Sequence, residues 1–152
     1  MSKLNIEGTW KLERFWFTDD LGSEVDPLGS SPTGNLILGG DDYFAFTMMR
    51  VDRSAYESGD LLSGTVNETS EAANGYVSFG GTWSLKEEFI HFEIAYSLFP
   101  NWVNGVQKRQ VSVIGDKLLL QTTSPILMAG KIHQGAARWQ RLSRNKKEKA
   151  VT

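Results

Sequence analysis

The chain has 152 residues, of which 40% are hydrophobic and 22% charged, with a formal net charge of −2 and no cysteine. This length supports one domain, and the balanced charge excludes the basic excess that nucleic-acid binding requires. The lack of cysteine excludes disulfides, thiol nucleophiles and sulfur-ligated metal sites. The opening MSKLNIEGTW has no apolar run of signal-peptide length, so we expect a cytoplasmic protein with no membrane partner.

Alternation of apolar and polar residues predicts strands along most of the chain. The first is expected at residues 6–17, with Trp10, Leu12, Arg14 and Trp16 sharing one face. Residues 18–34 are rich in Asp, Gly, Ser and Pro and predict a long connection over one end of the fold. A connection of this length is either a functional lid or a loose loop.

Two further strands are expected at residues 35–38 and 43–50, joined as a hairpin by Gly39-Gly40-Asp41-Asp42. Phe44, Phe46, Met48 and Arg50 share a face of the second strand. The polar residues 52–74 predict an excursion in which only residues 67–73 favour a helix, with a cap over the fold as one option. The remaining strands are expected at residues 76–85, 89–99, 105–114, 117–123 and 136–142.

The fold class that follows is all-β: a single antiparallel up-and-down barrel of about eight strands with at most a short helix. Closure of the sheet is favoured because it leaves no edge strand exposed. We assign residues 1–143 to this barrel domain. The remaining residues, 144–152, are basic and predict a flexible C-terminal tail.

Several segments together resemble the bacterial and fungal lipocalin-like domain family: GTWKL at residues 8–12, PLGSSPTGNLIL at 27–38, FPNWVNGVQKR at 99–109 and ARWQRL at 137–142. The resemblance implies a calycin-type barrel with an interior cavity. It also implies that Arg141, on the last strand, stacks on Trp10 and closes one end of the barrel. Some barrels of similar kind in natural-product pathways act as cyclases without a cofactor.

The arginines follow the apolar faces of the predicted strands, whereas Lys11 and Lys108 lie on the opposite faces. Arg14, Arg50 and Arg109 are therefore expected to point inward. A buried charge is costly unless it is paired, so an inward guanidinium favours a ligand carboxylate, enolate or phenolate. The alternative for Arg14 and Arg50 is that they lie at strand ends and reach water through their flexible stems.

Three further side chains are candidates for the same site. Gln107 shares a face with Arg109, and Tyr96 shares one with Phe92, so both are expected to point into the barrel. The Tyr96 hydroxyl either donates to a ligand or is satisfied by a neighbour. Trp102 follows a turn and lines the mouth of the barrel or caps its core.

The leading hypothesis is that the barrel binds a small, largely apolar molecule with an acidic or polar group. The expected ligand-binding residues are Arg14, Phe44, Phe46, Met48, Arg50, Phe79, Trp83, Phe92, Tyr96, Trp102, Gln107, Arg109 and Trp139, beside an apolar wall from Trp10. The alternative is a cofactor-free cyclase or isomerase, with Tyr96 and Arg109 as catalytic residues.

No cofactor is expected, because no glycine pattern matches a nucleotide-binding loop. His91 and His133 lack suitably spaced carboxylates, so we expect no metal site. The only partner expected is the small ligand or substrate. The sequence leaves the oligomeric state open, a homodimer included.

Overall fold

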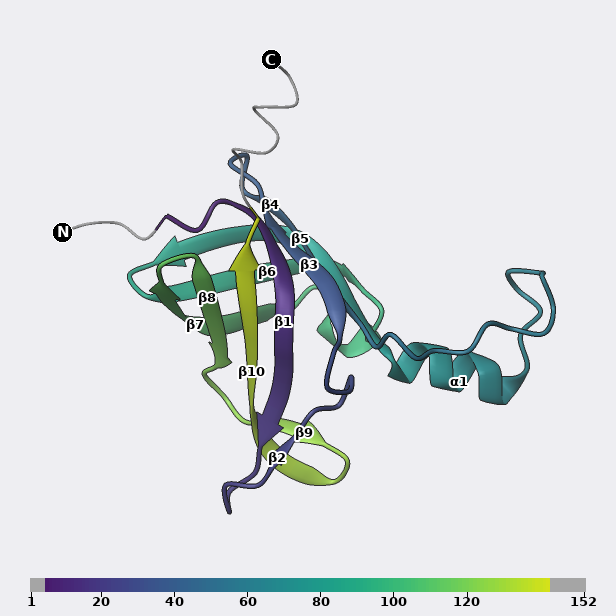
Figure 1. Ribbon diagram of the computed structural model, residues 1–152. Coiled ribbons are helices and arrows are strands. Elements are labelled where there is room, and N and C mark those ends of the chain that lie inside the picture. The colour runs from purple at the N-terminus through teal and green to yellow at the C-terminus, as the bar shows by residue number, and fades with distance from the viewer. Residues whose placement is uncertain (1–4, 143–152) are drawn as a thin grey trace.

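Eight antiparallel strands close into a barrel in the computed structural model, which describes residues 5–142 (Figure 1). Each of these eight strands pairs with the one that follows it in the sequence, and pairing of the first with the last closes the barrel. They are β1 (Gly8–Thr18), β3 (Thr33–Leu38), β4 (Tyr43–Met49), β5 (Tyr76–Lys86), β6 (Phe89–Ser97), β7 (Val106–Ile114), β8 (Lys117–Thr122) and β10 (Lys131–Arg141). The predicted all-β, up-and-down barrel is therefore confirmed.

Short strands extend the barrel at one end. β2 (Glu24–Val25) pairs with the end of β1, and β9 (Ile126–Met128) pairs with the start of β10. We call this the open end (Figure 1). A 3-10 turn, η1 (Pro100–Trp102), follows β6.

The opposite end is closed by contacts between the first and last strands. The guanidinium of Arg141 lies 4.2 Å from the centre of the Trp10 ring. It donates to the carbonyl oxygens of Glu7 at 2.8 Å and Asn5 at 2.7 Å, and the Trp10 indole donates to Ile6 O at 2.9 Å. The predicted stacking of Arg141 on Trp10 is confirmed.

A bulge in β1 reverses the direction of the side chains that follow it. Leu12 pairs with Trp139 and Arg14 with Arg138, so Glu13 is an extra residue. An extra residue moves every later side chain to the other face of the strand. The predicted inward direction of Arg14 and Trp16 is therefore wrong.

A second bulge has the same effect in β6. Gly80 of β5 pairs with Tyr96 and Gly81 with Ile94, which leaves Ala95 without a partner. Tyr96 is therefore 59% exposed on the outer surface, and its predicted inward direction is wrong. Its ring lies across Gly80, where a Cβ atom would come within 2.3 Å of the Tyr96 hydroxyl.

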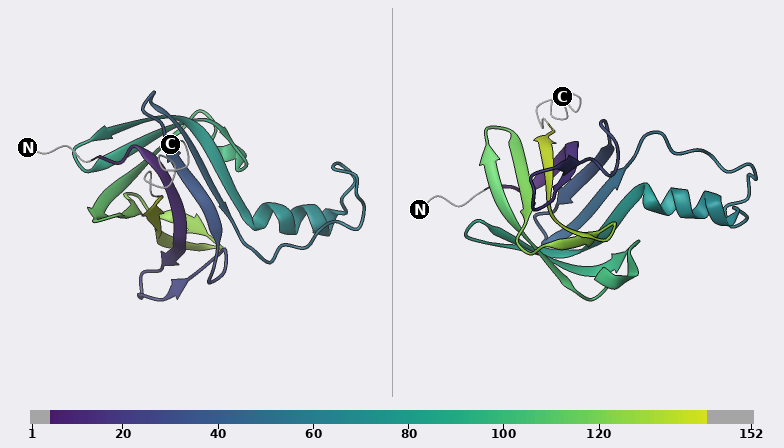
Figure 2. Two further views of the ribbon diagram at one scale, coloured as in Figure 1. Left: turned by 45° about the horizontal axis from the view of Figure 1, so that its top comes forward. Right: turned by 90° about the horizontal axis from the view of Figure 1, so that it is seen from below.

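Residues 51–74, which we call the arm, project from the side of the barrel and do not cap it (Figures 1 and 2). The arm contains α1 (Val66–Asn74), which confirms the predicted short helix. Thr65 and Glu68 form a capping box at its start. None of the α1 residues is buried, and Leu61, Leu62 and Val66 are more than 80% exposed.

The last strand begins earlier than predicted, at Lys131. His133 therefore lies within β10, where it is 7% exposed and packs against the edge of Phe17. The predicted basic tail at residues 144–152 lies outside the described residues. Within residues 5–142, no helix is long and apolar enough to span a bilayer.

Deletion of most of the arm should leave the barrel stable, because α1 buries no side chain against the barrel. Replacing residues 55–71 by a short Gly-Ser linker keeps the bond from Arg53 Nη1 to Ala72 O at the base of the arm. We expect the free energy of unfolding in urea to change by less than about 1 kcal/mol. A loss of several kcal/mol would show that the arm stabilises the barrel.

Candidate functional site

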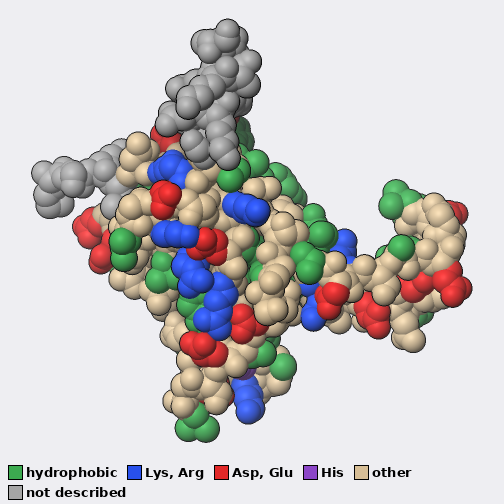
Figure 3. Space-filling view, in the orientation of Figure 1, with side chains coloured by type: hydrophobic (Ala, Val, Ile, Leu, Met, Phe, Trp, Pro, Cys, Tyr) green, Lys and Arg blue, Asp and Glu red, His purple; other side chains and the backbone are tan. Residues whose placement is uncertain are grey.

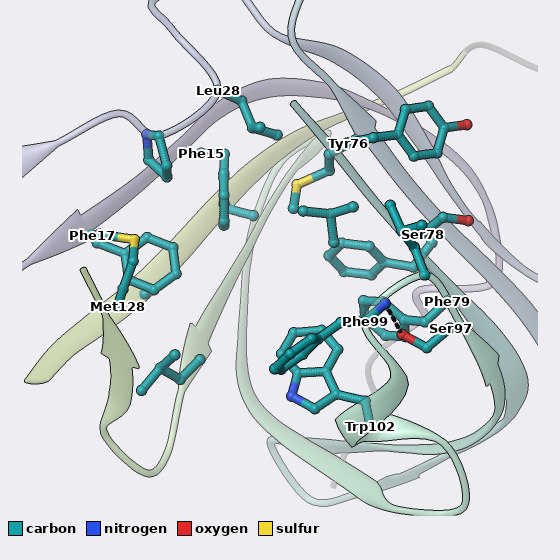
Figure 4. A pocket seen from close by; sticks show the side chains of 18 of the residues that line it. Phe15, Phe17, Leu28, Tyr76, Ser78, Phe79, Ser97, Phe99, Trp102 and Met128 are labelled. Atoms are coloured by element: carbon teal, nitrogen blue, oxygen red, sulfur yellow. Dashed lines mark hydrogen bonds between the residues drawn. The ribbon is translucent and has the colours of Figure 1, made fainter. Parts of the chain in front are cut away.

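The open half of the barrel encloses a cavity of about 540 Å³ (Figure 4). This volume is in the range of sites for small organic molecules. The walls are mainly apolar and aromatic, with contributions from most of the strands and from η1. The larger apolar side chains include Phe15, Phe17, Leu28, Phe46, Met48, Phe79, Leu98, Phe99, Trp102, Leu120 and Met128.

Aromatic rings form a continuous wall on one side of the cavity. The rings of Phe46 and Phe79 stack with their centres 4.4 Å apart, and Phe79 meets Trp102 edge to face at 5.2 Å. Trp102 is held there by η1, which Pro100 begins, and Phe99 packs against its ring at 5.6 Å. Such rings offer flat apolar surfaces against which an aromatic ligand packs well.

The long connection before β3 covers part of the open end. Leu28 is only 2% exposed and points into the cavity, as Figure 4 shows. The Arg50 Nη1 donates to the neighbouring Pro27 O at 3.3 Å, while its Nε pairs with Asp52 at 2.8 Å. Arg50 thus ties this connection to the base of the arm and lies outside the cavity.

Among residues 5–142, Arg109 is the one charged side chain that lines the cavity, and it is half-buried. Its Nη1 donates to Gln107 Oε1 at 3.0 Å and to Lys108 O at 3.1 Å, and both acceptors are neutral. Within residues 5–142, no carboxylate lies within 4.0 Å of its guanidinium. Its Nε and Nη2 make no hydrogen bond to the described residues, so these donors remain for a ligand.

Burial lowers the pKa of Arg109 to about 10. The cause is desolvation, which disfavours the charged form when no opposite charge compensates it. At neutral pH the side chain is still protonated. The cavity therefore has a positive charge beside an apolar wall, an arrangement that favours an acidic ligand.

The structure places several of the predicted site residues on the cavity wall: Phe46, Met48, Phe79, Trp102 and Arg109. Gln107 does not line the cavity, but its side chain accepts a hydrogen bond from Arg109, which does. Phe44, Phe92 and Trp139 are buried deeper, in the core toward the closed end. The ring of Trp139 packs edge to face under Phe46 at 5.2 Å.

Four more predicted site residues also lie away from the cavity. Arg14 pairs on the outer surface with Asp26 and Glu24, each at 3.0 Å. Figure 3 shows that positive and negative side chains are mixed on the face of the barrel formed by β1 and β10. Trp83 lies toward the closed end, where its indole donates to Gly39 O at 2.9 Å. Tyr96 is outside because of the β6 bulge, and Arg50 because β4 ends before it.

Sequence reasoning missed the cavity residues whose positions depend on bulges or loops. Phe15 and Phe17 face inward because of the extra residue Glu13. The Ser97 hydroxyl, at the end of the bulged β6, accepts from the Phe99 backbone at 3.1 Å (Figure 4). The aromatic pair in β1 was a usable signal, but strict alternation assigned it to the outer face.

Comparison with known proteins gives one family and one curated relative. A family model described as a lipocalin-like domain matches residues 7–142. The 4'-hydroxy-3'-methoxypropiophenone carrier protein ppsC of Aspergillus oryzae is 29% identical over 106 residues, which cover 64% of this chain and 95% of the relative. No solved structure gives a significant match.

The unpaired charge of Arg109 predicts that the ligand-free barrel is stabilised by its removal. Arg109→Met keeps much of the apolar stem and removes a desolvated cation, so we expect the free energy of unfolding to rise by about 1 kcal/mol. Urea unfolding measures this, with Lys86→Met at an exposed position as the control. A decrease of more than about 1 kcal/mol would mean that the guanidinium is satisfied without a ligand.

Proposed function

This chain belongs to the lipocalin-like domain family, and on that premise we propose that its barrel is a carrier for one small, largely apolar aromatic molecule with an acidic or strongly polar group. The ring of the ligand lies against Phe46, Phe79 and Trp102. Its polar group accepts hydrogen bonds from Arg109. The cytoplasmic location belongs to the same proposal.

The observation that carries this proposal is the state of Arg109. A guanidinium in an apolar cavity loses hydration, and two neutral oxygens on a single nitrogen compensate only part of that loss. A ligand anion would supply the missing opposite charge and accept from the remaining donors. A ligand anion therefore gains most of its binding free energy at Arg109, whose charge and remaining donors have no partner in the ligand-free protein among the described residues.

The name of the fungal relative supports the same chemistry. That protein is a carrier of 4'-hydroxy-3'-methoxypropiophenone, an aromatic ketone with a phenol group. In such a phenol the para carbonyl spreads the negative charge of the phenolate, which makes the group moderately acidic. A flat ring with one ionisable oxygen is the type of molecule that the cavity of this chain would accommodate.

The enzymatic alternative has less support. A cofactor-free cyclase or isomerase was expected to use Tyr96 and Arg109, but Tyr96 is on the outer surface, away from the cavity. Arg109 stays protonated at neutral pH, so it can donate hydrogen bonds but cannot act as a base. What remains is a binding site with one charged donor group among the described residues.

Calorimetry with the fungal relative's phenolic ketone and its methyl ether tests the proposal. At a pH at which the phenol is ionised, we expect the phenol to bind about tenfold more tightly than the ether. Arg109→Ala should remove this preference and leave the affinity for the ether within about twofold. Arg138→Ala, on the outer surface, is the matched control and should change neither affinity.

Two results would contradict the carrier proposal. One is that neither compound binds, and the other is that Arg109→Ala leaves the preference for the phenol intact. The recovered ligand should also be chemically unchanged after prolonged incubation, as judged by mass spectrometry and nuclear magnetic resonance. Conversion to an isomer would indicate an enzyme.

A further inference from the structure

Gln107 is the closest polar neighbour of the cavity cation. It lies two residues before Arg109 on the same face of β7, and its Oε1 accepts from Arg109 Nη1 at 3.0 Å. Gln107 itself does not line the cavity. It pairs across the sheet with the buried Phe92, while Arg109 pairs with Ile90, so both positions are fixed by the β6–β7 register.

The hydrogen bond from Arg109 to Gln107 determines which N–H groups of the guanidinium remain free for a ligand. Nη1 is occupied by Gln107 Oε1 and by Lys108 O, which leaves Nε and Nη2 as the available edge. That edge has two parallel N–H groups and matches the two oxygens of a carboxylate or sulfonate. Without the Gln107 contact, the long side chain would sample more rotamers and lose this orientation on average.

The second property of Gln107 is its lack of charge. A carboxylate at the same place would accept the same hydrogen bond and would also neutralise Arg109 by forming an internal ion pair. An amide orients the guanidinium and leaves its positive charge available. The other acceptor of Arg109 is the backbone carbonyl of Lys108, which is neutral. The side chain at position 107 therefore decides the net charge of the site.

We propose that Gln107 is a positioning residue that makes the cavity selective for ionised ligands, because its neutral amide holds Arg109 without cancelling its charge. This inference rests on the proposed function and goes beyond it by assigning selectivity to a residue outside the cavity wall. A single change, Gln107→Glu, should convert the site into one that prefers neutral ligands.

The test uses two fluorescent probes that share the same aromatic ring system and differ only in one charged group. Anilinonaphthalene sulfonate is an anion, and N-phenylnaphthylamine is its neutral counterpart without the sulfonate. Dissociation constants are measured by fluorescence titration for the parent protein and for Gln107→Glu, Gln107→Met and Arg109→Met. Gln110→Glu is the matched control, because it adds the same charge to the exposed outer face of β7.

For Gln107→Glu we expect the affinity for the sulfonate to fall about tenfold or more, with the neutral probe within about twofold of the parent. Gln107→Met keeps the charge of Arg109 and loses its orientation, so a smaller fall, about threefold, is expected for the sulfonate alone. Gln110→Glu should change neither constant beyond twofold. A purely structural role of Gln107 would instead weaken both probes equally.

The outcomes separate the two proposals. If the parent binds neither probe, or if Arg109→Met does not weaken the sulfonate, the proposed function fails and this inference fails with it. If Arg109→Met weakens the sulfonate but Gln107→Glu behaves like Gln110→Glu, the carrier proposal stands and the role of Gln107 is refuted. Equal losses for both probes in Gln107→Glu also refute it.

Discussion

The cost of desolvating Arg109 is the constraint from which the account of this barrel follows. Its guanidinium lines a cavity with mainly apolar walls and, within residues 5–142, has only neutral acceptors. A charge in such a place is stabilised by a counter-charge, by water or by removal of the proton. Because arginine keeps its proton at neutral pH, the carrier that we propose would gain most from a ligand that brings the counter-charge with it.

The closed half of the barrel makes this site possible. Trp10, Trp139 and Phe92 are fully buried there, and Arg141 joins the first and last strands around Trp10. A packed half fixes the strand register, and rigid strands hold Arg109 in the same cavity as the aromatic wall. Stability and binding are thus separated along the barrel axis, which lets the open half contain free volume.

Much of this arrangement could be predicted from the sequence, because it depends on local periodicity. Alternation in β4 places Phe46 and Met48 on the inner face, and alternation in β7 places Arg109 with Val111. Two of the errors, those for Arg14 and Tyr96, have one physical origin. A bulge adds a residue without leaving a pattern in the sequence, and the bulges at Glu13 and Ala95 reversed Arg14 and Tyr96. The position of Leu28 in the cavity depends on loop packing, which alternation does not describe.

The crystal structure of the complex with anilinonaphthalene sulfonate tests the central claim most directly. We predict that a sulfonate oxygen lies within hydrogen-bond distance of the Arg109 Nε or Nη2, with the naphthalene ring against Phe46, Phe79 and Trp102. The account is contradicted if the probe lies in the cavity with its sulfonate in solvent, or if it binds elsewhere on the barrel and leaves Arg109 with its two neutral acceptors.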